Sequence, residues 1–481
     1  MNFSMIRLIL SWVFRFVGLF LLLPCLVAIY YKEPEGFVYL IIGLCVLIFG
    51  YVLGIKKVTD RRFYAKEGFV TVALCWICIS AIGAIPFVAT GEIPFVVDAL
   101  FESVSGFSTT GASILTDIEA LSYTSLFWRS FTHWIGGMGI LVFIMAILPL
   151  AGGYNMHLMR AEIPGPTVGK MVPKVRQTAI TLYAMYIVMT IAEIIILMIA
   201  KVPLYEALNL TFTSAGTGGF AIFNDSVASY SNAVHNILTV FMLMFGVNFN
   251  VYFIFMIMRK PLWALKNEEV RYYLLFYGAA VAMITAAVYK SFATFSDAFH
   301  HTIFTVASIM TSTGICTVDY AAWPMFAQVV LILLMFCGGC AGSTAGGIKV
   351  IRIVLMLKLA KNEMSFLVHP RRVRPIRFDG RVQSKDTVRS VQAFVITYVC
   401  ILVVSLLVVS LNGFDFGTTF SSVVAMINNT GPGIGLVGPT GNYSIFSPLS
   451  KVVFMFNMLA GRLELFPLLM LFWPATWRKW K

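Results

Sequence analysis

Charged residues are scarce in this sequence. Asp, Glu, Lys and Arg make up 12% of the 481 residues, whereas a soluble domain usually carries about 25%. Hydrophobic residues make up 59%, and several nearly uncharged runs reach the roughly 20 residues that a helix needs to cross a bilayer. This composition excludes an ordinary soluble domain and predicts a polytopic, all-α membrane protein.

The sequence also lacks the residue sets that disulfide-linked domains and membrane enzymes require. Two cysteine pairs have CxxC spacing but lie inside apolar runs, where a redox or zinc motif has no aqueous context: Cys75/Cys78 and Cys337/Cys340. We interpret them as small apolar filler. His300 and His301 form the only adjacent histidine pair, and the sequence indicates no partner for them. The sequence therefore predicts no enzyme.

Alternate loops hold almost no basic residues. These residues gather instead in five segments, at 56–66, 160–176, 259–271, 371–389 and 478–481. An excess of Lys and Arg marks cytoplasmic loops, so both termini are expected in the cytoplasm. The net charge of +13 then indicates topology and contact with anionic membrane lipids, and no nucleic-acid partner is expected.

The first apolar segment, 8–31, lacks the small-residue cleavage site of a signal peptide and is longer than a usual apolar signal core. We interpret it as a retained span that forms a hairpin with the next apolar run, 37–55. The first predicted unit is therefore an N-terminal two-helix hairpin with its basic loop, residues 1–67.

A pattern then occurs four times: a long span, a short half-apolar segment, a glycine-containing loop and a second span. The predicted repeats cover residues 68–177, 178–271, 272–386 and 387–481. A period of about 100 residues is too long for a solenoid and predicts a pseudo-fourfold arrangement with about ten spans. Each short segment starts near an acid that suits a helix N-cap, namely Asp98, Glu206, Asp297 and Asp415.

The four short segments end in similar loops on the side without basic residues. Their key dipeptides are Thr110-Gly111, Gly218-Gly219, Thr313-Gly314 and Thr430-Gly431. A re-entrant backbone is tolerated at membrane depth only where it is buried or lines a water-filled cavity. Backbone carbonyls can replace the water shell of a monovalent cation, and glycine adopts the required conformation at low cost. Four such loops together predict an ion filter.

Acidic residues on the same side predict an acidic vestibule that concentrates cations. The candidates are Asp98, Glu102, Glu206, Asp225, Asp297, Asp319 and Asp415. Helix capping alone would explain about half of them.

A glycine-rich segment at 336–349 has two interpretations that spacing does not separate. Gly338, Gly342 and Gly346 could form a small-residue packing face on a helix, or the helix could be broken and its middle could act as a gate. In the last span, Arg462 should face a cavity or a partner, because a basic residue at the helix centre costs about 2.5–3.5 kcal/mol. A structural salt bridge is the alternative, although Glu464 projects elsewhere.

The other ionisable residues in the spans are expected to have structural roles or have no predicted role. Lys349 and Arg352 are expected to extend toward the inner interface. Arg129 and His133 are expected to be interfacial or packing residues, and Glu193 has no assigned role.

Four motifs resemble the TrkH/TrkG potassium-uptake subunits of the Trk/Ktr/HKT superfamily. They are the Ser-Thr-Thr-Gly-Ala loop at 108–112 and the segments 128–139, 338–352 and 461–464. The resemblance implies potassium as the transported ion, with no bound cofactor, in a prokaryotic plasma (inner) membrane. It further implies a homodimer controlled by a cytosolic TrkA-type nucleotide-binding regulatory subunit.

The same resemblance implies roles for individual residues. Filter glycines fall on Gly111, Gly219, Gly314 and Gly431, and the pore arginine on Arg462. The gating segment comprises Gly338, Gly339, Gly342, Ser343, Thr344, Gly346 and Gly347. The fourth loop departs from the pattern because Asn428, Asn429 and Pro432 surround its glycine. Symport with sodium or protons through the same pore is the alternative, although a coupled carrier usually shows inverted repeats.

Overall fold

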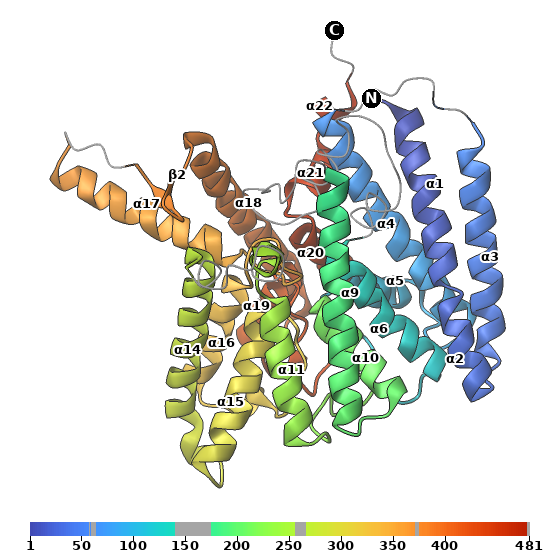
Figure 1. The fold of residues 1–481 in the computed structure, drawn as a ribbon, viewed down its shortest axis with the longest axis horizontal. Helices are drawn as coiled ribbons and strands as arrows, with labels where there is room; N and C mark the ends of the chain where they lie inside the picture. The colour runs from blue at the N-terminus through green and yellow to red at the C-terminus, as the bar shows by residue number, and fades with distance from the viewer. Residues whose placement is uncertain (57, 59–63, 140–174, 255–265, 371–374, 479–481) are drawn as a thin grey trace.

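The computed structural model describes residues 1–56, 58, 64–139, 175–254, 266–370 and 375–478. Part of the second span predicted for the first repeat and most of the basic segments 160–176 and 259–271 lie outside these residues, as do parts of the basic segments 56–66, 371–389 and 478–481. The described chain is almost entirely helical (Figure 1).

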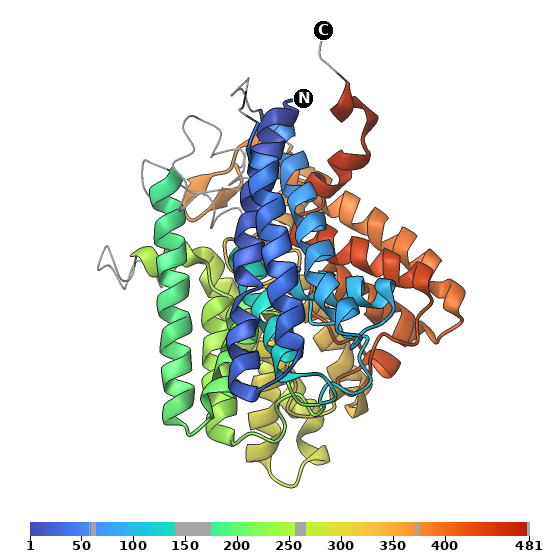
Figure 2. The same ribbon diagram turned by 90° about the vertical axis from the view of Figure 1, so that its right-hand side faces the viewer.

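Three N-terminal helices form one flank of the molecule (Figures 1 and 2). They are α1 Phe3–Phe20, α2 Leu23–Tyr31 and α3 Glu35–Gly54. Glycines let the backbones of α1 and α3 approach closely, because a Cβ atom placed on Gly18 would lie 2.8 Å from the carbonyl oxygen of Gly43. The two runs predicted as a hairpin therefore pack tightly against each other.

The remaining helices follow in chain order and are given in four groups. The first group is α4 Ala65–Ala89, α5 Val96–Phe107 and α6 Tyr123–Met138, and the second is α9 Val175–Ile199, α10 Leu204–Gly216, α11 Asn232–Phe245 and α12 Phe249–Tyr252. The third is α14 Glu268–Val288, α15 Phe295–Met310, α16 Met325–Cys337 and α17 Val350–Val368. The fourth is α18 Lys385–Val409, α19 Phe416–Ile427, α20 Pro448–Arg462, α21 Phe466–Phe472 and α22 Pro474–Trp477.

Short 3₁₀ turns and one small hairpin complete the described structure. The turns are η2 Tyr289–Ser291, η3 Tyr320–Ala322, η4 Ser410–Asn412 and η5 Gly435–Val437. Strands β1 Arg377–Phe378 and β2 Arg381–Val382 pair antiparallel beside α17 (Figure 1). A turn at Asp379 and Gly380, both with positive φ, folds this segment back on itself, and the described chain is otherwise helical as predicted.

Six helices of the described part are long and apolar enough to cross a membrane. They span Phe3–Tyr31, Glu35–Gly54, Ala65–Ala89, Gln177–Ile199, Glu268–Ser291 and Lys385–Asn412. The start of α1 and the short helix α22 lie at the same end of the molecule (Figures 1 and 2). The fold is thus that of a helical membrane-type protein.

Besides a buried hydrophobic core, the described chain has many exposed large apolar side chains and many buried polar ones. On α3, Phe37, Ile41 and Ile48 are 72%, 60% and 59% exposed, whereas Ser105 and Thr110 are fully buried. Large apolar side chains are costly to expose to water, at about 25 cal/mol per Å². Their continuous exposure therefore indicates a lipid-facing surface around a polar centre.

The short helices α5, α10, α15 and α19 carry their acids near their N-termini, but only one acid is a cap. Asp415 accepts a hydrogen bond from the Thr418 N–H at 2.9 Å, and the hydrogen bonds from Thr418 lower the pKa of Asp415. In α15 the cap is Thr294, which accepts from the Asp297 N–H at 3.1 Å. Asp98, Glu206 and Asp297 lie in the first turn, so the N-cap prediction is wrong for these three, although they still face the positive helix end.

Candidate functional site

Each of the four short helices ends in the same turn. The residue before the key glycine donates its N–H to the carbonyl five residues earlier, which is the 6→1 bond of a Schellman C-cap. The four bonds are Thr110 to Ser105 at 2.9 Å, Gly218 to Thr213 at 2.9 Å, Thr313 to Ser308 at 2.8 Å and Thr430 to Ala425 at 2.9 Å. The repeated loop sequences therefore produce one repeated backbone conformation.

Each loop has positive φ angles at the same two positions. Gly111, Gly219, Gly314 and Gly431 have φ angles of 77°, 98°, 83° and 88°. The residues two positions earlier are also left-handed, with φ of 55° at Thr109, 54° at Thr217, 56° at Ser312 and 54° at Asn429. A left-handed non-glycine residue costs roughly 1–2 kcal/mol. Four equivalent strained positions therefore indicate a functional site.

The four loops form a closed ring of backbone contacts, which we call the glycine ring. A Cβ atom placed on Gly431 would lie 2.5 Å from the carbonyl oxygen of Thr110. In the same way, a Cβ atom on Gly111 would overlap the carbonyl oxygen of Gly218. One on Gly219 would overlap that of Thr313, and one on Gly314 would overlap that of Thr430. The contacts run from the first loop through the second and third to the fourth, and then back to the first. This ring brings all eight predicted filter residues together.

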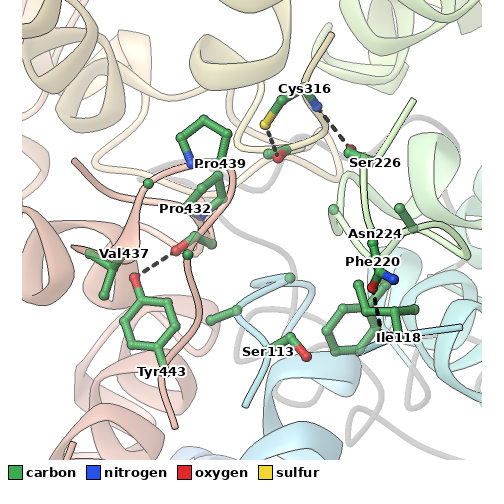
Figure 3. Close-up of a pocket in the computed structure, with 18 of the residues that line it drawn as sticks. Ser113, Ile118, Phe220, Asn224, Ser226, Cys316, Pro432, Val437, Pro439 and Tyr443 are labelled. Atoms are coloured by element: carbon green, nitrogen blue, oxygen red, sulfur yellow. Dashed lines mark hydrogen bonds between the residues drawn. The ribbon is translucent and has the colours of Figure 1, made fainter. Parts of the chain in front are cut away.

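A pocket opens beside the glycine ring, lined by the ring glycines and by residues that follow them (Figure 3). None of the seven acids predicted for a vestibule lines this pocket within the described chain, and Arg129 is the one charged lining residue. Asp98 instead pairs with Lys451 at 2.6 Å, and Glu102 pairs with Arg129 at 2.7 Å. The acidic-vestibule prediction is therefore wrong for the wall of this pocket.

Arg129 and Glu102 form a buried ion pair that supports two loops. Their side chains are 1% and 0% exposed. Arg129 donates to the Ala221 carbonyl at 3.2 Å and lies over the Phe220 ring, while Glu102 accepts from the Ile114 N–H at 3.1 Å. Arg129 is therefore neither interfacial nor simple packing, because it fixes the segments that follow Gly111 and Gly219.

Replacing Arg129 with methionine should destabilise the fold by about 3–5 kcal/mol, because Glu102 would remain as an uncompensated buried charge. The measurement is the unfolding temperature of the purified protein in detergent. Lys358→Met is the matched control: Lys358 pairs with Glu268, but the two side chains are 27% and 23% exposed, so its loss should cost less than about 1 kcal/mol. Equal losses for both variants would contradict a special role for the buried pair.

His133 links the first short helix to the second loop through both ring nitrogens. Its Nδ1 lies 2.7 Å from the Gly106 carbonyl oxygen, to which it donates, and its Nε2 accepts from the Phe220 N–H at 3.2 Å. These partners define a neutral ring with the proton on Nδ1. A Cβ atom on Gly218 would overlap the imidazole, so this glycine is needed for the close approach. The prediction of a generic packing residue missed this bridge.

The predicted gating segment is a break between two helices. Helix α16 ends at Cys337 and α17 begins at Val350. Between them, Gly338, Gly342 and Gly347 have φ angles of 64°, 71° and 82°, which side chains with a Cβ rarely adopt. The helix is therefore broken at this segment, and the alternative of a helical packing face is wrong. The gating role of the segment stays a prediction.

This glycine-rich loop contacts residues that come just before the ring glycines in the third and fourth loops. The Gly346 N–H donates to Ser312 Oγ, and a Cβ atom on Gly346 would overlap the Asn428 carbonyl oxygen. The start of the loop is held by Glu269, which accepts from the Ala341 N–H at 2.6 Å. The pocket and the loop thus lie at opposite ends of the four short turns.

The remaining predicted residues of the loop contact the loop itself and the end of α11. Ser343 Oγ donates to the Cys340 carbonyl at 2.6 Å, and Thr344 Oγ1 donates to the Phe245 carbonyl at 3.3 Å. A Cβ atom on Gly339 would lie 2.5 Å from the Ala345 side chain. The loop is therefore closely packed rather than loosely suspended.

Arg462 connects the glycine-rich loop to α6. Its guanidinium donates to the Thr344 carbonyl at 2.7 Å and to the carbonyls of Gly136 and Gly137. Glu464 is not its partner and pairs instead with Arg352. The expectation of a cavity or partner is met by backbone carbonyls of two separate segments.

The basic residues after the loop were predicted to extend to the inner interface, but both are buried. Lys349 is 2% exposed and Arg352 is 4% exposed. Lys349 Nζ donates to the Ala345 carbonyl, and Arg352 lies over the Phe394 ring while pairing with Glu464. The correction has a physical reason, because both residues find oxygen partners within the fold.

The structure also supplies partners for residues that the sequence left unassigned. Glu193 accepts from Ser214 Oγ of α10 at 2.5 Å. His300 Nε2 lies 3.2 Å from His235 Nδ1, and His301 Nδ1 lies 2.9 Å from Thr317 Oγ1, so the prediction that this pair lacks partners is wrong. The described residues nevertheless include no group of three or more His, Cys, Asp or Glu that could hold a metal ion.

Comparison with known proteins agrees with the resemblance found in the sequence. The TrkH family, described as a cation transport protein, matches residues 35–479. The chain is 36% identical over 475 residues to the Trk system potassium uptake protein TrkH of Salmonella typhimurium. The aligned region covers 95% of this chain and 96% of that protein. It is 33% identical over 492 residues to the Trk system potassium uptake protein TrkG of Escherichia coli K12, with 99% and 100% covered.

A solved structure gives the same result. The crystal structure of the potassium transporter TrkH from Vibrio parahaemolyticus matches with a TM-score of 0.89 and 32% identity, covering 99% of this chain and 100% of that chain. The predicted family and the prediction of a transporter rather than an enzyme are confirmed by these matches. The chain belongs to the TrkH family of cation transport proteins.

Proposed function

We propose that this protein takes up potassium through the glycine ring, which acts as a selectivity filter. The closed ring of four equivalent loops is the observation that carries the proposal. Among the described residues, no hydrogen bond reaches the carbonyl oxygens of Thr110, Gly218, Thr313 or Thr430. Oxygens without hydrogen-bond donors are available to replace the water shell of a dehydrated cation. The names of the relatives as potassium uptake proteins favour potassium as that cation.

The ring also supports a pseudo-fourfold architecture. Its contacts follow the order of the four predicted repeats, 68–177, 178–271, 272–386 and 387–481, and the hairpin at 1–67 lies outside it. We propose about ten spans in all, in a prokaryotic plasma membrane with both termini cytoplasmic. The common position of α1's start and α22 agrees with that orientation (Figure 1), as does the distribution of basic residues.

The glycine-rich loop at 338–349 is the proposed gate. It contacts Ser312 and Asn428, which directly precede the ring, and Arg462 holds it against α6. Residues Gly338, Gly339, Gly342, Ser343, Thr344, Gly346 and Gly347 form this gate. By family resemblance, we propose that the protein works as a homodimer in contact with anionic lipids, and that a cytosolic TrkA-type nucleotide-binding subunit controls the gate.

Expression together with its regulatory subunit should restore growth of a potassium-uptake-deficient bacterium at micromolar-to-millimolar potassium. Rubidium flux in liposomes should be saturable and should proceed without an imposed proton or sodium gradient, because a ring of carbonyls needs no coupling ion. An empty vector is the growth control. Flux that requires a gradient would favour symport, and absence of both growth and flux would sink the proposal.

A further inference from the structure

One ring glycine differs from the others in what its carbonyl oxygen contacts. The hydroxyl of Tyr443 donates to the Gly431 carbonyl at 2.8 Å (Figure 3). Cys316 Sγ lies 3.3 Å from the Gly314 carbonyl oxygen, and a thiol is only a weak donor. In the part of the chain that the structure describes, no donor reaches the corresponding carbonyls of Gly111 and Gly219. The four loops therefore make equivalent backbone contacts, but only the Gly431 carbonyl is held by a strong hydrogen-bond donor among the described residues.

Tyr443 is itself fixed in place. It is 2% exposed, and its N–H donates to the Ser113 carbonyl at 2.9 Å, which joins the fourth loop to the first. Its ring packs against Phe101 at 5.8 Å and Phe454 at 5.6 Å between ring centroids. Because the backbone and the ring are both held, the hydroxyl cannot follow the carbonyl if the carbonyl turns.

We propose that Tyr443 is a positioning residue that sets ion specificity by restraining the Gly431 carbonyl. A dehydrated sodium ion is smaller than potassium, so the surrounding oxygens must move inward to coordinate it. A carbonyl bonded to an immobile phenol resists that movement, whereas potassium requires none. This inference rests on the proposed function, because it assigns a specificity role within the same filter.

The sequence offers no sign of this role. Tyr443 lies twelve positions after Gly431 in a loop without regular structure, and no other ring glycine receives a tyrosine hydroxyl within the described residues. The hydroxyl also bonds no other group there, so its removal changes one contact only.

The test is Tyr443→Phe in the full-length protein, assayed with its regulatory subunit in liposomes containing potassium or sodium. The potassium-to-sodium flux ratio should fall about threefold to tenfold, the range expected for one net hydrogen bond, while potassium flux persists. Tyr320→Phe is the matched control. Tyr320 is 1% exposed, and its hydroxyl has no hydrogen-bond partner in the described structure, so its ratio should not change.

The outcomes separate this inference from the proposed function. A wild-type protein without potassium flux would overturn the function itself. Wild-type flux combined with an unchanged ratio in Tyr443→Phe would overturn the role of Tyr443 alone. If Tyr443→Phe is not recovered folded, 3-fluorotyrosine at position 443 keeps the shape and alters donor strength: a changed ratio supports the role, and an unchanged ratio overturns it.

Discussion

Gly111→Ser is expected to lower the potassium-to-sodium flux ratio by at least about tenfold. The serine Cβ would overlap the Gly218 carbonyl oxygen, and the left-handed backbone at this position, with φ of 77°, adds roughly 1–2 kcal/mol of strain. The second loop must then move outward, which widens the ring and would weaken the proposed selection of potassium. Flux ratios in liposomes measure the effect.

Gly91→Ser is the matched control for this substitution. Gly91 has almost the same backbone, with φ of 79°, but no atom lies within 4 Å of an added Cβ. It should therefore show the strain alone, as a small loss of stability with an unchanged ratio. Unchanged selectivity in Gly111→Ser as well would remove Gly111 from the filter.

Arg462→Ala is expected to raise flux in the absence of the regulatory subunit by about tenfold or more. The guanidinium joins the Thr344 carbonyl of the loop to the Gly136 and Gly137 carbonyls, and hydrogen bonds from a charged group are each worth about 1.5–3 kcal/mol. Their loss shifts the loop toward open arrangements. Rubidium uptake into liposomes without the partner measures the change.

Arg462→Lys gives a graded comparison, because an ammonium keeps the charge but lacks the planar fork that reaches two segments. Its flux should lie between wild type and alanine. A product that fails to fold in both variants would assign Arg462 a structural role instead, and flux equal to wild type in a folded alanine variant would remove it from the gate.

The four loops could be located from the sequence because the features that create them are local. Each turn depends on a bond between residues five positions apart, such as Thr110 and Ser105, and on a glycine that tolerates positive φ. Comparing the four repeats then separated the meaningful glycines from ordinary turn residues. The break at 338–349 was foreseeable for the same reason, although spacing alone left a helical face open.

The restraints on those loops could not be predicted because they join distant segments. Glu102 looked like a free carboxylate until Arg129, on a different helix, was seen to neutralise it. Arg462 was correctly expected to need partners, but its partners are backbone carbonyls, which no side-chain pattern reveals. Tyr443 and His133 could not be identified as supports because both bond the backbone of a loop. The loop bonded by His133 lies 87 positions away, and Tyr443 bonds Gly431 across an irregular segment of 12 positions.

The closure between the first and last loops has a consequence for biosynthesis. Asn429 Nδ2 donates to Thr110 Oγ1 at 2.9 Å across 319 positions, so the first loop leaves the ribosome long before its partner exists. At about 5–20 residues per second, the delay is on the order of tens of seconds. During that time the first re-entrant segment must reside in the membrane with its polar backbone lacking the neighbour that later encloses it. Under the proposed function, the ion path is completed only after the last repeat has been inserted, and a partly made chain has no closed glycine ring.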